Sequence, residues 1–434
     1  MKNRCVKKFA LVLIVVSILL LSACNKNSNN VEFTNADELN NVSYISDFSC
    51  IYEHEDTLYY ACDFGTSNLY ISFLNRETGK TYPLCSRPEC MHQNSKFNGE
   101  YLSEDSCNAC IGDSAGVGGT MFQGLVAVYD GYVYTIGTDF ETRSVIRISL
   151  DGSKKEKVVD IGNYFIEGSE YNHGNGGYLP DINRFNICND ALYFYVHTNN
   201  FSLGSFDSDD IMASGRNVEV YKVNLKGTPK LEKIFYEPSD PQERYDQVSG
   251  LYYGKDSVYL QIKKIYSMED VRADIYKLNT ECNGFDLLKS DVKDYVEFDS
   301  NKKGYYYSDG DKLMFTSFDS DQTQLVYTFD EVNQDMIFQC IVYGDYLFLN
   351  RGMGNTVYIY NIKENKLVRT IEFESDDKNK AAIFISKIEN GTIYINFFSP
   401  TQIDGKSLMY AYASIEDVIN SKETWNKIAY EVTQ

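Results

Sequence analysis

The sequence predicts an all-β protein with the architecture of a seven-bladed β-propeller. A tight-turn signal followed by an alternating apolar strand recurs seven times along its 434 residues. The chain also contains 36 Tyr and only 7 Pro, a composition that favours strands with half-exposed aromatic faces. The seven turn signals are His54-Glu55-Asp56, Asp130-Gly131, Asn189-Asp190, Lys255-Asp256, Asp309-Gly310-Asp311, Gly344-Asp345 and Asn390-Gly391.

Most of these signals are followed by a second hairpin and a further apolar run, so one unit contains four antiparallel strands. Between Asp56 and Gly391 the signals return about every 56 residues, a period typical of propeller blades with loops. One such sheet leaves its faces exposed, and stacking copies around an axis buries them. A pair of β-sandwiches is the alternative fold. Because the interval from Gly310 to Asp345 is short, six or eight blades are alternatives for the count.

The N-terminus has the order of a bacterial lipoprotein signal. Four basic residues, the last of them Lys8, precede an apolar core that is too short to span a membrane. The core ends at Leu21-Ser22-Ala23-Cys24, which resembles a lipobox at every position. We therefore expect a signal peptide over residues 1–23 and a Cys24 that is diacylated through its sulfur and holds the protein on the membrane. An ordinary N-terminal membrane anchor is the alternative.

Residues 24–43 are predicted to be a flexible tether, because the polar run over 25–30 has nothing to bury. The expected propeller fills residues 44–434. Without residues 1–23 the chain has 37 basic and 62 acidic residues, a net charge of −25, which argues against nucleic acid as a partner. Asn25 does not signal inner-membrane retention, and the Asn, Lys, Tyr and Ile bias indicates an AT-rich Gram-positive source. We expect lipid anchoring to the cell membrane, facing the extracellular side.

A cluster of cysteines and one histidine lies between the first two predicted blades, in an insertion over residues 85–110. It follows the spacing C-x4-C-x-H-x14-C, with one more cysteine three residues later: Cys85, Cys90, His92, Cys107 and Cys110. A closed Cys3His zinc site made by the first four would staple a loop that lacks a core of its own. Disulfides, which an extracellular location permits, and packed or reactive thiols are the alternatives.

Two long segments, 162–181 and 198–216, depart from the period. Loops of this kind cover one face of a propeller or the mouth of its channel, where ligands usually dock. The candidate ligand-binding residues in them are His173, Asp207, Asp209 and Asp210.

A short helix is predicted over residues 414–419. Ser414 is a candidate N-cap, and Asp417 stands at the third helical position.

The chain resembles a group of clostridial lipoproteins with propeller bodies. The resemblance is carried by the lipobox, by the repeated turn-strand pattern and by Pro83-Leu84-Cys85, Cys90, His92 and Cys107-Asn108-Ala109. It covers nearly the whole chain and implies no assigned activity. The similarity to TolB-like and BamB-like propellers is one of architecture, which does not fix function.

No H-E-x-x-H or G-x-x-x-x-G-K-[ST] signature occurs in the sequence. We therefore expect a membrane-anchored extracytoplasmic lipoprotein that acts as a binding or scaffold platform for an extracellular glycan, peptide or protein. An extracellular hydrolase or lyase that uses loop carboxylates or His173 is the main alternative. A structural subunit of an envelope or transport complex is the other.

Overall fold

The computed structural model describes a large part of the chain. The described residues are 44–45, 51–55, 57–63, 68–75, 80–90, 92, 102, 106–113, 126–138, 143–161, 181–199, 216–238, 246–253, 257–267, 270–293, 295–298, 304–320, 322–329, 337–351, 355–376, 380–403 and 406–429.

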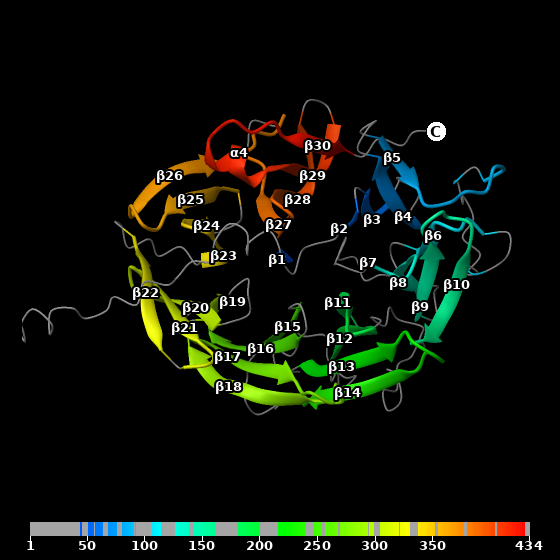
Figure 1. Ribbon diagram of the computed structural model, residues 1–434, viewed down its shortest axis with the longest axis horizontal. Helices are drawn as coiled ribbons and strands as arrows, with labels where there is room; N and C mark the ends of the chain where they lie inside the picture. Colours follow the sequence, from blue (N-terminus) through cyan, green and yellow to red (C-terminus); the bar gives the residue numbers. More distant parts are fainter. Residues whose placement is uncertain are drawn as a thin grey trace, which may run out of the picture.

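The strands form seven antiparallel blades around one axis, as the sequence predicts (Figure 1). Blade 1 contains β2 (Ile51–His54), β3 (Thr57–Asp63), β4 (Asn68–Asn75) and β5 (Lys80–Pro83). Blade 2 contains β7 (Ala127–Tyr129), β8 (Tyr132–Thr138), β9 (Arg143–Ser149) and β10 (Lys155–Asp160). Blade 3 contains β11 (Asp181–Cys188), β12 (Ala191–Asn199), β13 (Arg216–Asn224) and β14 (Leu231–Glu237). Blade 4 contains β15 (Asp246–Tyr253), β16 (Val258–Ser267), β17 (Asp270–Leu278) and β18 (Phe285–Lys293).

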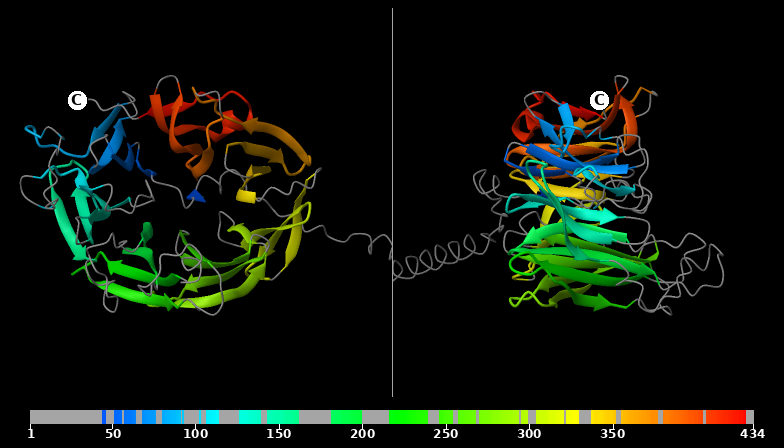
Figure 2. Two further views of the ribbon diagram at one scale, coloured as in Figure 1. Left: turned by 180° about the vertical axis from the view of Figure 1, so that it is seen from behind. Right: turned by 90° about the vertical axis from the view of Figure 1, so that its right-hand side faces the viewer.

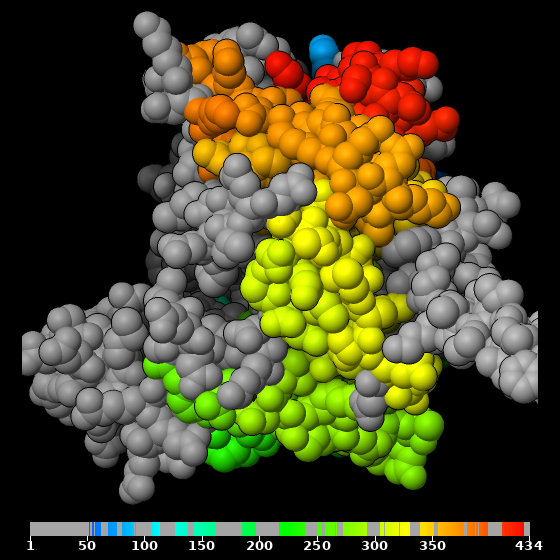
Figure 3. Space-filling model, turned by 90° about the vertical axis from the view of Figure 1, so that its left-hand side faces the viewer, coloured from blue at the N-terminus to red at the C-terminus, as the bar shows by residue number. Residues whose placement is uncertain are grey.

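The last three blades repeat this order. Blade 5 contains β19 (Tyr295–Phe298), β20 (Gly304–Asp309), β21 (Lys312–Ser317) and β22 (Thr323–Thr328). Blade 6 contains β23 (Ile337–Tyr343), β24 (Tyr346–Arg351), β25 (Val357–Asn361) and β26 (Lys366–Ile371). Blade 7 contains β27 (Ile383–Glu389), β28 (Thr392–Ile403), β29 (Lys406–Ser414) and β30 (Asn426–Ala429). The outer surfaces of blades 4 to 7 follow one another in chain order, from green through yellow and orange to red (Figure 3).

Two further strands join neighbouring parts of the ring. Strand β6 (Cys110–Asp113) links blades 1 and 2 into one nine-stranded sheet, and β1 (Tyr44–Ile45) adds a fifth strand to blade 7. Within each blade the hydrogen-bonded order is the chain order, with the first strand nearest the axis (Figures 1 and 2). The sandwich alternative and the counts of six and eight blades are therefore wrong.

Among the described residues, the hydrophobic core forms seven clusters, one at each interface between adjacent blades. This arrangement follows from the sequence, because a blade with apolar residues on both faces buries them only between two neighbours. The cluster between blades 7 and 1 closes the ring. There Leu58 and Tyr60 pack with Tyr394 and Tyr410, and the rings of Tyr60 and Tyr410 meet edge to face at 6.1 Å. Apolar packing thus joins the first blade to the last.

The predicted turns take the backbone conformation that their residues favour. Asp130 and Gly131 have φ of 47° and 77°, and Asn390 and Gly391 have φ of 49° and 73°. Two successive positive φ values define the type I′ turns that match the twist of a hairpin. In blades 1, 2, 3, 6 and 7 the signal joins the first strand of the blade to the second.

Blade 5 corrects one part of the predicted repeat. There Asp309-Gly310-Asp311 joins β20 to β21, which is the second hairpin of the blade and not the first. The first two strands of this blade, β19 and β20, are connected over residues 299–303. Asx-Gly chemistry suits any tight hairpin, so the sequence does not tell the two positions apart. This shift explains the short interval that had left the blade count open.

The predicted helix near the C-terminus is confirmed as α4 (Ile415–Ile419). The side chain of Ser414 accepts a hydrogen bond from the backbone N–H of Asp417 at 3.4 Å, as an N-cap does. Ile415 and Val418 are buried in the cluster between blades 6 and 7.

In the part of the chain that the structure describes, no helix has the length and apolar character needed to cross a membrane. The predicted signal over residues 1–23, the lipidation site Cys24 and the tether over 24–43 lie outside the described residues.

Candidate metal centre

The cysteine-histidine insertion interrupts the outer strand of blade 1. Strand β5 pairs with residues 72–75 of β4, and β6 pairs with residues 68–70 of the same strand. Ile71, which lies between them, accepts a hydrogen bond from the N–H of Leu84 at 2.8 Å and donates one to the carbonyl of Ala109 at 2.9 Å. The insertion therefore leaves and re-enters the sheet at Ile71. The sequence placed it between blades 1 and 2, whereas the structure places it within the outer strand of blade 1.

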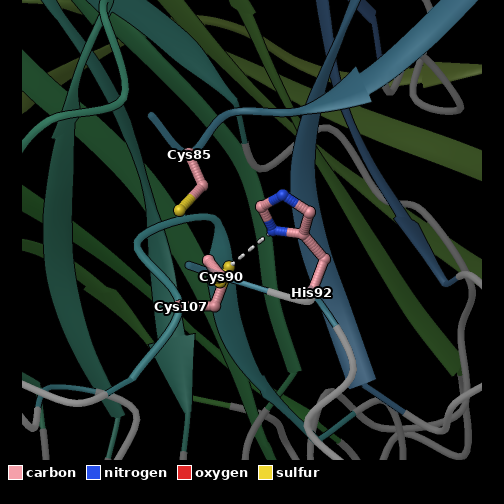
Figure 4. Close-up of side chains that lie close together, drawn as sticks. All are labelled: Cys85, Cys90, His92 and Cys107. Carbon is pink, nitrogen blue, oxygen red and sulfur yellow. Dashed lines mark hydrogen bonds between the residues drawn. The ribbon is translucent and has the colours of Figure 1, made fainter. Parts of the chain in front are cut away.

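Four of the predicted residues converge in this insertion. The ligand atoms of Cys85, Cys90, His92 and Cys107 all lie within 4.8 Å of one another. Their side chains point toward a common centre, and Nδ1 of His92 lies 3.4 Å from Sγ of Cys107 (Figure 4). These are the four residues for which a Cys3His site was one of the three alternatives left open by the sequence.

Tight turns bring the sulfurs together. The N–H of Cys90 donates to the carbonyl of Arg87, and the N–H of Cys110 donates to the carbonyl of Cys107, each at 3.1 Å. The backbone N–H groups of Arg87 and Asn108 point at the sulfur of Cys85. Such N–H contacts stabilise negative charge on a sulfur.

A hairpin of blade 2 holds the insertion from the other side. The carbonyl of Gly152, in the turn between β9 and β10, accepts hydrogen bonds from the N–H of Ser86 at 3.1 Å and from Nδ2 of Asn108 at 2.9 Å. Gly152 has a φ of +69°, and a Cβ there would lie 2.8 Å from the backbone nitrogen of Cys85. Only glycine combines this φ with this close approach.

Lys155 of β10 brings a positive charge to the same place. Its Nζ donates to the carbonyls of Cys107 at 2.7 Å and Cys110 at 3.0 Å, and to Oγ of Ser106 at 3.1 Å. Burial lowers the pKa of Lys155 to about 8. The insertion is thus bonded to blade 1 through β4 and to blade 2 through Gly152 and Lys155.

Two of the sulfurs are hydrogen-bonded to each other. The thiol of Cys107 donates a hydrogen bond to the sulfur of Cys85, which lowers the pKa of Cys85 and raises that of Cys107. Cys85, Cys90 and Cys107 carry free thiols in the structure. Thiolate and imidazole are ligands that hold Zn²⁺ in tetrahedral geometry, with sulfurs about 3.8 Å apart for bonds of about 2.3 Å. The cluster could therefore hold a metal ion such as zinc.

The fifth residue of the predicted set, Cys110, lies elsewhere. Cys110 begins β6 and is fully buried in the hydrophobic cluster between blades 1 and 2, and it does not belong to the four-residue group. The predicted ligand-loop residues His173, Asp207, Asp209 and Asp210 lie outside the described residues.

No pattern in the sequence indicates the two blade 2 residues that hold the site. Gly152 stands in an ordinary Asp-Gly hairpin signal, and Lys155 is one of many lysines in the chain. The turn that contains Gly152 resembles the equivalent turn of another blade. Its local sequence therefore does not indicate that Gly152 contacts Cys85.

Comparison with known proteins supports the fold. No model of a known protein family matches the chain, and no curated protein matches its sequence. Among solved structures, it is similar to one from a structural and mechanistic study of two prolyl endopeptidases, at 14% identity and a TM-score of 0.51 over 92% of this chain and 52% of that one. This chain thus spans about half the length of that endopeptidase.

Two other solved structures are similar over most of both chains. One is the β-propeller domain of the Trilobed protease from Pyrococcus furiosus, at 9% identity and a TM-score of 0.43 over 86% of this chain and 92% of that one. The other is the polysaccharide lyase Uly1, at 10% identity and a TM-score of 0.44 over 85% and 90%. At such identities the likeness concerns the fold alone and identifies no family or lineage. The chain is a seven-bladed β-propeller, similar in fold to the structure from the study of prolyl endopeptidases.

Proposed function

We propose that this chain is a lipid-anchored extracytoplasmic protein whose propeller is a binding or scaffold platform for an extracellular glycan, peptide or protein. The observation that carries the proposal is the order of the parts: a basic, apolar, lipobox-like start precedes a polar run and then one closed, rigid ring. A rigid body on a lipidated tether presents a surface at the cell exterior without the need for a membrane span.

The positions of the strand ends indicate which face of the ring would bind a partner. The segment between Asp160 and Asp181 contains His173, and the segment between Asn199 and Arg216 contains the three aspartates. Both segments connect strand ends on one face of the ring, opposite the tight turns that follow each first strand. Long connections on a rigid scaffold are where binding residues concentrate.

The test uses the full-length lipidated protein and a panel of glycans, cell-wall fragments and peptides, with turnover monitored beside binding. Saturable binding without product supports the platform. If the protein forms product and His173→Ala abolishes this activity, the platform proposal is overturned in favour of a hydrolase or lyase. If the protein co-purifies with a stable membrane complex and binds no small ligand, a structural subunit is favoured. Acyl labelling that persists in Cys24→Ala would contradict the lipid anchor.

We also propose that Cys85, Cys90, His92 and Cys107 bind one structural Zn²⁺. The support is the donor set itself, since three sulfurs and one imidazole fill a tetrahedral shell and leave no open position for catalysis. The separation of 3.4 Å between His92 and Cys107 is close to the roughly 3.6 Å expected for nitrogen and sulfur on one zinc. Zinc in such a site contributes directly to folding stability.

Metal analysis of the purified protein tests this assignment. We expect one zinc per chain in the wild type and a loss of zinc in Cys90→Ser and in His92→Ala. Cys282→Ser is the matched control, because Cys282 is a half-buried cysteine in the β17–β18 turn, outside the cluster. Metal-free protein in which mass spectrometry finds Cys85, Cys90 or Cys107 in a disulfide would refute the zinc site.

A further inference from the structure

Strand β1 fixes the direction in which the chain enters the propeller. It pairs antiparallel with β27, the first strand of blade 7, and lies on the inner side of this blade, near the axis (Figure 1). In this pairing Tyr44 faces Ile388 and Ile45 faces Lys387. Since β27 ends at Glu389 and β1 runs antiparallel to it, Tyr44, the first residue of β1, lies near the end of β27 that leads into the Asn390-Gly391 turn. The chain therefore enters from the side of this turn.

The two faces of the ring are distinguished by their connections. We name the face that carries Asn390-Gly391 the turn face. The same face carries the corresponding turns Asp130-Gly131 and Asn189-Asp190, because each of them ends the innermost strand of a blade. Strands β10 and β12 run the other way, so the long connections after Asp160 and Asn199 start on the opposite face, which we name the loop face.

The continuation of the chain beyond β1 agrees with this direction. Strand β2 begins at Ile51 and ends at His54, next to the tight turn at Glu55. Because β2 is the first strand of blade 1, its end lies on the turn face and its start on the loop face. Strand β1 thus runs from the turn face toward the loop face, which is the face where β2 starts.

From this geometry we propose that the turn face of the propeller is directed toward the membrane and that the loop face is directed away from it. The inference rests on the proposed anchor at Cys24, and it adds which surface a partner can reach. The tether predicted over residues 24–43 would have a root-mean-square span of about 25 Å as a flexible chain. This span is similar to the height of the ring, since strands of 7–9 residues are about 25–30 Å long. Attachment at one face therefore favours one orientation of the propeller relative to the membrane, and the tether is long enough that the ring need not contact the bilayer.

The consequence for function is a separation of roles. The face with short turns receives the anchor, and the face with long connections is open to glycans, peptides or proteins outside the cell. A platform with its ligand loops on the anchored side would instead compete with the bilayer for the same space.

Energy transfer from tryptophan to a dansyl-labelled phospholipid in vesicles tests the orientation. The chain has one tryptophan, Trp425, so Trp425→Phe gives a silent background. Into it we place a single probe on either face. One is Glu364→Trp in the exposed β25–β26 turn on the turn face, and the other is Asp309→Trp at the exposed end of β20 on the loop face. We expect at least about two-fold more transfer from Glu364→Trp, because the faces are about 25 Å apart. A deletion of residues 31–40 should increase this ratio.

A second form of the protein separates this inference from the proposed anchor. In it a His tag replaces residues 1–24 and attaches the chain to a nickel-chelating lipid. If natural lipidation fails but the tagged form gives the expected ratio, the proposed anchor is wrong and the entry direction is right. Equal transfer from the two probes in the tagged form, or more transfer from Asp309→Trp, overturns the inference.

Discussion

A single methyl group added to Gly152 should damage the metal centre from the neighbouring blade. Gly152→Ala places a Cβ 2.8 Å from the nitrogen and 2.9 Å from the Cα of Cys85, and 3.0 Å from the carbonyl carbon of Leu84. All three atoms are backbone, so the conflict is not relieved by a side-chain rotation. The β9–β10 hairpin and the chain around Cys85 must move apart, and the bonds from the Gly152 carbonyl to Ser86 and Asn108 weaken.

The chain contains a matched control for this change. Gly227 occupies the corresponding turn of blade 3, has a φ of +83°, and has no atom within 4 Å of the position a Cβ would take. Gly227→Ala therefore meets only the cost of a left-handed backbone, about 1 kcal/mol. Gly152→Ala has the same backbone cost and, in addition, an overpacking cost of about 1–3 kcal/mol. We expect it to lower the free energy of unfolding by about 2–4 kcal/mol in total.

Urea denaturation of the zinc-loaded variants, with zinc affinity measured by chelator competition, checks this difference. Displacement of Cys85 should weaken zinc binding in Gly152→Ala. The zinc dissociation constant should rise about tenfold for each 1.4 kcal/mol of overpacking free energy that is lost from zinc binding. Gly227→Ala should bind zinc as the wild type does. Equal loss of stability and unchanged zinc affinity in both variants would refute the view that blade 2 shapes the site.

Three further changes probe contacts elsewhere in the ring. Lys155→Met should lower zinc affinity, because it removes a cation beside a site that carries three thiolates. Lys154→Met changes an exposed neighbour and should leave zinc affinity unchanged. Chelator competition measures both affinities. Gln339→Leu should lower the free energy of unfolding by about 2–4 kcal/mol in urea titrations, because Gln339 is buried and bonds both the N–H and the carbonyl of Ile385 across blades 6 and 7 at 3.0 Å. Ser414→Ala should lower it by about 0.5–1 kcal/mol through loss of the helix cap, a shift that thermal melting would detect.

The architecture could be predicted because its signals are local and repeated. Asp130-Gly131 and Asn390-Gly391 specify left-handed turns by their own chemistry, and the alternating strands beside them specify two buried faces. The cap at Ser414 is equally local. The prediction placed the Asp309-Gly310 turn in the first hairpin of blade 5, whereas it lies in the second. The residues are the same in kind as those of the other turns, so their chemistry does not show which hairpin they form.

The candidate site could be predicted only in part. The spacing of Cys85, Cys90, His92 and Cys107 predicted a zinc site as one of three alternatives, and the structure brings these four residues together. The break in the outer strand had no signal, because β5 and β6 have four residues each and are too short to show a clear alternation. Cys110 was placed in the cysteine-histidine cluster by its spacing, although it begins β6 and packs into the core.

The role of blade 2 shows why local chemistry is insufficient for this site. Leu150-Asp151-Gly152 and Leu225-Lys226-Gly227 are equivalent turns in neighbouring blades, and both glycines have positive φ for the same conformational reason. Only Gly152 also lies against the backbone of Cys85, a contact set by how two blades stack and not by the turn itself. A metal bound by blade 1 residues would thus be held in place by blade 2 as well. Loss of the metal would loosen the interface between two blades, and not merely one surface loop.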